Sequence, residues 1–211
     1  MPDAVVPTPL TQLLQHPALW RGRSVAPLAT LATGFAALDA ALPGGGWPRN
    51  GLIEILTARQ ALGELQLWLP ALAALSRAPD PRWCAFVDPP FQLFAPAFAA
   101  AGVALDRLLI LHPAGPLWAT EQALRSGACD LVLAWASRAP LRELRRLVLA
   151  SEQGRATAVL FRPLSAEHES SPAVLRLAVQ ARSQGLTLRI VKSRGIARDL
   201  IDLPFAGQTG A

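Results

Sequence analysis

Short apolar runs alternate with helical patterns along most of the chain, and this alternation limits the fold more than any other feature. The runs are rich in Val, Ile, Leu and Trp and lie at 52–56, 83–88, 107–111, 131–135 and 157–162. Helical patterns fill the gaps near 60–77, 91–101, 117–127 and 140–153. Strands buried on both faces give continuous apolar runs, and strands that alternate with helices are typical of parallel sheets. We therefore expect an α/β fold, a mostly parallel sheet flanked by helices.

The 211 residues predict one core between two shorter ends. Residues 1–30 carry several prolines and a short apolar patch, so we expect an N-terminal arm. This arm would dock through four apolar side chains, Leu13, Leu14, Leu19 and Trp20. Residues 31–203 form the core, and 204–211, "PFAGQTGA", is expected to be a flexible tail.

The last third of the chain contains residues that are typical of helix ends. Gly154 follows the helix pattern of 140–153 and fits a C′ residue in the left-handed conformation. The next segment, "SSPAVLRLAVQARSQG", predicts a further helix with Ser171 as N-cap, Pro172 at the first helical position and Gly185 at C′. Beyond it the sequence predicts one or two terminal strands, with Gly195 at a turn.

Composition argues against a membrane protein and a metal centre. The longest uncharged apolar stretch, 93–105, is too short to cross a bilayer and contains Pro96 and Gly102. The first ten residues lack the basic and apolar regions of a signal peptide. The two cysteines are neither paired in a CxxC motif nor near a histidine cluster, so we expect buried thiols and no zinc or other cofactor. The expected location is the cytoplasm.

Positive charge is concentrated in the last third. Residues 1–137 hold 8 Arg against 9 Asp and Glu, a net charge of −1, whereas 138–202 hold 12 Arg and Lys against 6 Asp and Glu, a net charge of +6. A basic face attracts nucleic acid or an acidic partner, although a solvated arginine-rich surface gives the same pattern.

The segment between the first core strand and the following helix reads "TARQALGELQL". A phosphate loop would stand here, with glycines that let backbone N–H groups converge, a Lys for the terminal phosphates and a Ser or Thr for Mg²⁺. This segment has one glycine, Gly63, followed by Glu64 and Leu65. A carboxylate repels triphosphate, and a lone Arg59 does not replace the converging donors.

The motifs around this segment resemble a RecA-type core. They are the entry "TGFAALDAALPGGGWPRNGLIEI", then "AFVD", "LLIL", "EQAL", "SGA" and "DLVLAW" in the order found in RecA. The resemblance implies a Glu that activates water after the "AFVD" strand and an Asp near Mg²⁺ at the end of "DLVLAW". The matching positions hold Pro90 and Trp135. We therefore expect a RecA-like fold with a degenerate nucleotide site and no ATP hydrolysis.

Within this superfamily the chain most resembles the ImuA family, over roughly residues 13–200. The specific motifs are "TGFAALDAALPGGGWPRNGLIEIL", "GELQLWLPALAAL", "VDPPFQLFAPAFAAAGV" and "LWATEQALRSGACDLVLAW". The resemblance implies an accessory role in SOS-inducible, error-prone translesion DNA synthesis. The implied partners are an ImuB-like inactive Y-family polymerase, a DnaE-type error-prone polymerase and RecA.

Two other functions remain open. SulA-like division inhibitors, which bind FtsZ, resemble the later half of the chain but lack the full "TGFAALDAALPGGGWPR" entry. A surviving ATPase that uses unusual residues is the third hypothesis. Nucleotide-dependent thermal stabilisation would reveal such an enzyme.

Several residues are candidates for contact with a partner or with DNA phosphates. Trp47 and Arg49 in "GGGWPR" are residue types favoured as interface anchors, although Trp47 could instead pack internally or plug the nucleotide site. The other candidates are basic, and they are Arg142, Arg145 and Arg146 on one helix stripe and Lys192, Arg194 and Arg198 around the Gly195 turn. Because few aromatic residues accompany them, phosphate contact is favoured over base stacking.

Overall fold

An eight-stranded, mostly parallel sheet forms the centre of the computed structural model, which describes residues 29–58, 63–193 and 200–204. The strand order is β10-β9-β8-β3-β7-β6-β4-β5, and all neighbours from β8 to β5 are parallel, whereas β8, β9 and β10 pair antiparallel. The strands are β3 (Leu52–Thr57), β4 (Trp83–Val87), β5 (Leu108–Leu111), β6 (Cys129–Trp135), β7 (Thr157–Pro163), β8 (Leu175–Arg182), β9 (Gly185–Lys192) and β10 (Leu200–Pro204). The expected α/β class is confirmed.

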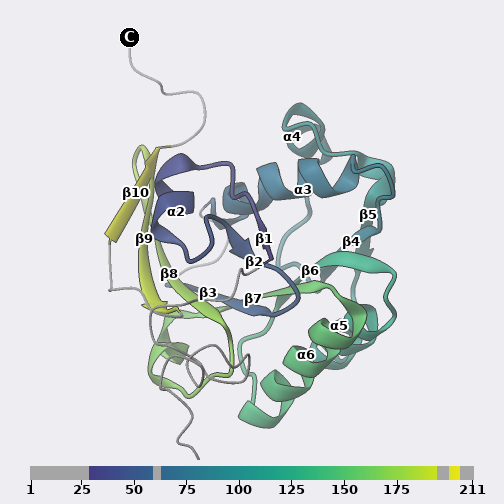
Figure 1. Ribbon diagram of the computed structural model, residues 1–211. Helices are drawn as coiled ribbons and strands as arrows, with labels where there is room; N and C mark the ends of the chain where they lie inside the picture. Colours follow the sequence, from purple (N-terminus) through teal and green to yellow (C-terminus); the bar gives the residue numbers. More distant parts are fainter. Residues whose placement is uncertain (1–28, 59–62, 194–199, 205–211) are drawn as a thin grey trace, which may run out of the picture.

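Helices cover both faces of the sheet (Figure 1). On one face lie α3 (Leu69–Ser76) and α4 (Ala95–Ala100), and on the other lie α5 (Pro116–Arg125) and α6 (Leu141–Gly154). The shorter elements are α2 (Ala36–Ala41), the ribbon of β1 (Thr30–Leu31) and β2 (Trp47–Pro48), and three 3₁₀ turns, η1 (Glu64–Trp68), η2 (Leu105–Arg107) and η3 (Leu164–His168). From β3 to β7 the order of elements matches the predicted alternation of strands and helices.

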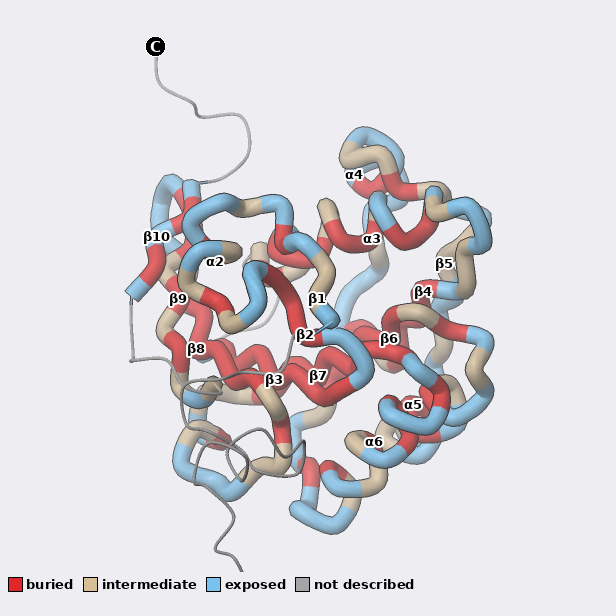
Figure 2. Tube along the Cα trace, in the orientation of Figure 1, coloured by how far each residue is buried: buried red, intermediate tan, exposed pale blue. Residues whose placement is uncertain are grey.

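The core has two layers, one on each side of the sheet (Figure 2). All six residues of β3 are buried, as its continuous apolar run predicts. Ile53 and Ile55 join the layer that includes Leu72 of α3, and Leu52 joins the layer that includes Leu144 of α6. The sequence pattern places the strand in the middle of the sheet because both of its faces are apolar.

The helix predicted over residues 171–185 is wrong. Leu175–Arg182 form β8, which pairs with β3 on one side and with β9 on the other. Leucine, alanine, arginine and glutamine favour helices locally, but pairing between two strands and burial of Leu175, Leu177 and Val179 override that preference. Gly185 is not a helix cap but the first residue of β9.

The first and last strands of the described residues are β1 and β10. β1 begins at Thr30, and β10 ends at Pro204. Residues 1–28 and 205–211, which hold nearly all of the predicted arm and tail, lie outside the described residues. The predicted turn at Gly195 also lies outside them.

Gly154 has a different role from the predicted one. It is the last residue of α6, and Arg155, with φ of 51°, takes the left-handed conformation in its place. A Cβ at Gly154 would lie 1.8 Å from the carbonyl oxygen of Leu124, so glycine permits close packing of α6 on the end of α5.

We expect Gly154→Ala to lower the free energy of unfolding by about 1–3 kcal/mol, because the backbone must shift to admit the methyl group. Urea unfolding measures the change. The matched control is Gly115→Ala, whose Cβ would lie 3.8 Å from that of Trp118 and should cost less than about 0.5 kcal/mol. Equal losses in the two variants would contradict this account of the packing.

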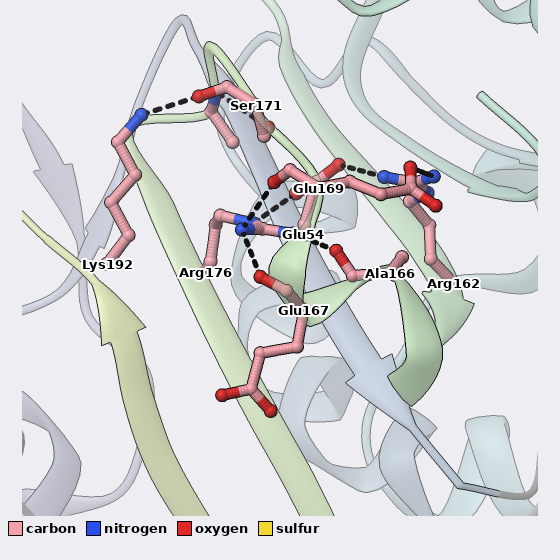
Figure 3. Close-up of polar contacts among 9 residues, drawn as sticks. Glu54, Arg162, Ala166, Glu167, Glu169, Ser171, Arg176 and Lys192 are labelled. Carbon is pink, nitrogen blue, oxygen red and sulfur yellow. Dashed lines mark hydrogen bonds and ion pairs between the residues drawn. The ribbon is translucent and has the colours of Figure 1, made fainter. Parts of the chain in front are cut away.

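A buried ion network ties three strands together (Figure 3). The carboxylate of Glu54 on β3 is fully buried and accepts hydrogen bonds from Arg162 on β7 and Arg176 on β8. Arg162 also donates to Glu169 at 2.7 Å, and Arg176 donates to backbone carbonyls of the segment that contains η3. The network fixes η3 against the sheet.

Candidate functional site

The candidate site lies at the carboxyl ends of β3, β4 and β6. Open α/β sheets bind ligands at this edge, because the loops that follow parallel strands meet there. Gly63, Glu64 and Leu65 follow β3, Pro90 follows β4 and Trp135 ends β6. All five line one cavity of about 250 Å³. The structure thus brings together every position at which the sequence predicts a lost ATP-site residue.

The cavity is apolar. Apart from these residues its described walls consist of Pro89, Phe91, Gln92, Leu93, Phe94, Ala97 and Phe98. Glu64, which is only 3% exposed, is the one charged side chain among the described lining residues. Binding of a triphosphate requires cations and converging N–H groups. The described walls of the cavity carry no cationic side chain, and their apolar side chains suit an apolar group.

The described part of the segment between β3 and α3 begins at Gly63. Gly63 has a φ of 102°, in the left-handed region, and Glu64–Trp68 form a 3₁₀ turn before α3 begins at Leu69. The helix predicted from residue 60 is therefore regular only from Leu69. Residues 59–62, including Arg59, lie outside the described residues.

Trp135 fills space where the resemblance implies a metal-binding Asp. Its ring stacks on Phe161 with centroids 4.6 Å apart and lies 6.4 Å from Phe86, and the side chain is 5% exposed. An indole packed in this way offers no ligand to Mg²⁺. No cluster that could hold a metal ion occurs among the described residues.

Two aromatic residues at the cavity were missed by the sequence analysis. Phe91 and Phe94 line the cavity and are 57% and 69% exposed. Large apolar side chains that remain exposed together mark interaction surfaces. The signal was present in "PPFQLF", which follows β4 and holds two phenylalanines where loops are usually polar.

The candidate anchor Trp47 is not on the surface. It is 1% exposed and stacks on Trp68, with ring centroids 4.3 Å apart. The partner-anchor interpretation of this residue is therefore wrong, because β2 turns its side chain into the core. Trp47 does not line the cavity, so internal packing is its role.

The three arginines that were predicted to form one basic stripe on α6 differ in exposure and in ion pairing. Arg142 and Arg145 are exposed. Arg146 is half-buried and pairs with Glu121 of α5, which also pairs with Arg125 at 2.9 Å. Because Glu121 is only 1% exposed, these two arginines compensate a buried carboxylate. Two of the three predicted residues therefore remain available for a partner or for phosphates.

The remaining basic candidates lie at the other end of α6 or beyond the described residues. The guanidinium of Arg49 lies 3.8 Å from the carboxylate of Asp130. Arg49 also lines a hollow together with Glu152 of α6 and Ser193, the residue that follows β9. Lys192 on β9 donates to the carbonyl oxygen of Ser171 at 2.7 Å. Arg194 and Arg198 lie outside the described residues.

Both cysteines are buried, as the sequence predicts. Burial, reinforced by the nearby Asp130 carboxylate, raises the pKa of Cys84 to about 12. Burial also raises the pKa of Cys129 to about 11, against the opposing charge of Arg82. Both thiols are therefore protonated at neutral pH.

We expect neither thiol to react with a thiol-labelling reagent in the folded protein, and both to react after denaturation, because the thiolate is the reactive species. In the folded protein the pKa values of both thiols lie above the ordinary value of 9.0. Unfolding exposes the thiols and lets them lose their protons, so the free energy of unfolding falls as the pH rises from about 9 towards 11–12. Mass spectrometry after labelling, with and without denaturant, counts the modified thiols. Rapid labelling of the folded chain would contradict their burial.

Comparison with known proteins gives the class of the chain. It is 38% identical over 111 residues to RecA from Clavibacter michiganensis subsp. michiganensis, a match covering 51% of this chain and 30% of that protein. RecA from Methylobacterium sp. is 36% identical over 118 residues, covering 54% of this chain and 32% of the relative. The chain is thus a relative of the RecA superfamily, matched over about a third of the length of these curated relatives.

The chain belongs to the family defined by the MT3502 N-terminal domain, whose model matches residues 40–166. Among solved structures, SulA from Pseudomonas aeruginosa matches with 27% sequence identity and a TM-score of 0.44, covering 53% of this chain and 97% of that one. Within the described residues, no helix is long and apolar enough to span a membrane.

Proposed function

We propose that this protein is a cytoplasmic, non-catalytic accessory factor of SOS-inducible, error-prone translesion DNA synthesis, of the ImuA type. One observation carries the proposal. In a chain related to RecA, the positions at which an ATPase needs Lys, Ser or Thr, Glu and Asp are Glu64, Leu65, Pro90 and Trp135, and all four line one apolar cavity. Because phosphoryl transfer depends on positioning and charge neutralisation, this chain acts through binding.

The apolar rim of the cavity supports a role in partner binding. Phe91 and Phe94 stand at the edge where a RecA-type ATPase would hold nucleotide, and both are more than half exposed. Aromatic side chains are enriched at interface hot spots. In this proposal the surface once used for nucleotide contacts a protein, and the partners are an ImuB-like inactive polymerase, a DnaE-type polymerase or RecA.

The exposed arginines of α6 give the proposal a second, weaker contact. Arg142 and Arg145 have no ion pair within the described part of the chain. In this account they contact DNA phosphates without reading sequence, as arginines at protein–DNA interfaces commonly do. Such contact would weaken steeply with salt.

Affinity capture of the tagged full chain from DNA-damaged cells, followed by quantitative mass spectrometry, tests the proposal. We expect enrichment of an ImuB-like protein, a DnaE-type polymerase or RecA over a tag-only control. The variant Phe91→Ser/Phe94→Ser should lose these proteins. The matched control is Leu149→Ser/Leu200→Ser, which changes two leucines that are 60% and 69% exposed away from the cavity.

Each other outcome of the capture contradicts part of the proposal. Enrichment of FtsZ without any translesion protein would assign the chain to division control, as in the SulA-like alternative. Equal loss of partners in the two double variants would show that the rim is not the binding surface. Capture of none of these proteins would contradict the accessory role.

A further inference from the structure

We draw no further inference here: the strongest candidate, the uncharged edge strand β5 (Leu108–Leu111) with the apolar hollow that Trp83 and Trp118 line beside it, carries none, because nothing in the described part of the structure shows what covers this surface.

Discussion

The substitution Glu54→Leu is expected to lower the free energy of unfolding by about 3–5 kcal/mol, because it leaves two buried arginines without their shared carboxylate. Glu54 is fully buried, and Arg162 and Arg176 are 1% and 4% exposed. Neither guanidinium can reach solvent, so the lost partner is not replaced by water. Chemical denaturation monitored by circular dichroism measures the change.

Two further variants separate the charge network from simple packing. Glu169→Gln removes another partner of Arg162, but its carboxylate is 57% exposed, so the loss should be under about 1 kcal/mol. Replacing all three network residues, Glu54→Leu with Arg162→Met and Arg176→Leu, should recover most of the stability, because an apolar core of similar volume needs no compensation. A loss at Glu54 no larger than that at Glu169 would contradict the buried network.

The substitution Trp135→Ala is expected to lower the free energy of unfolding by about 3–5 kcal/mol. It removes the ring that stacks on Phe161 and opens a void next to the existing cavity. The result bears on the proposed function, because the resemblance to RecA implies a metal-binding carboxylate at this position. Urea unfolding of the variant and the wild type gives the difference.

Trp118→Ala is the matched control for this prediction. It removes the same side chain from α5, where the ring is 61% exposed, and should change stability by less than about 0.5 kcal/mol. Trp135→Phe should lose less than Trp135→Ala because a ring remains against Phe161. If alanine at position 135 costs no more than at position 118, the Trp135 ring does not stabilise the packing beside the cavity.

The central strands were predictable because their burial is symmetric. β3 and β6 are apolar on both faces and follow turns rich in glycine or small residues. The apolar pattern and the preceding turn residues therefore both indicate a strand at each position. β8 was not predictable in this way. Its residues favour helix, and pairing with two strands overrides that preference: β9, which follows it directly as a hairpin, and β3, which lies more than 100 residues earlier in the chain.

The candidate site was predictable in composition but not in shape. Gly63, Glu64, Leu65, Pro90 and Trp135 could be selected because the resemblance to RecA implies groups that phosphate transfer needs at or beside these positions. That they enclose an apolar cavity rimmed by Phe91 and Phe94 depends on the order of β3, β6 and β4 in the sheet. Burial of Trp47 and pairing of Arg146 with Glu121 likewise depend on contacts between distant elements.

The loss of nucleotide chemistry and the gain of a binding surface are linked in this account. The side chains that remove the charge of a phosphate site, Leu65, Pro90 and Trp135, are also those that make its walls apolar. In our proposal, the residues that would abolish ATP hydrolysis also leave an apolar cavity, and its exposed rim, Phe91 and Phe94, is the partner surface.

Titration of the full chain with Mg²⁺–ATP, followed by calorimetry and by melting temperature, tests the central claim most directly, with RecA as the positive control. The account predicts no saturable heat, no rise in melting temperature and no ATP turnover above background, since a ligand that binds only the folded state would raise its stability. Saturable binding of Mg²⁺–ATP, together with ATP turnover that is lost in Glu64→Ala, would contradict the account and identify the chain as an ATPase.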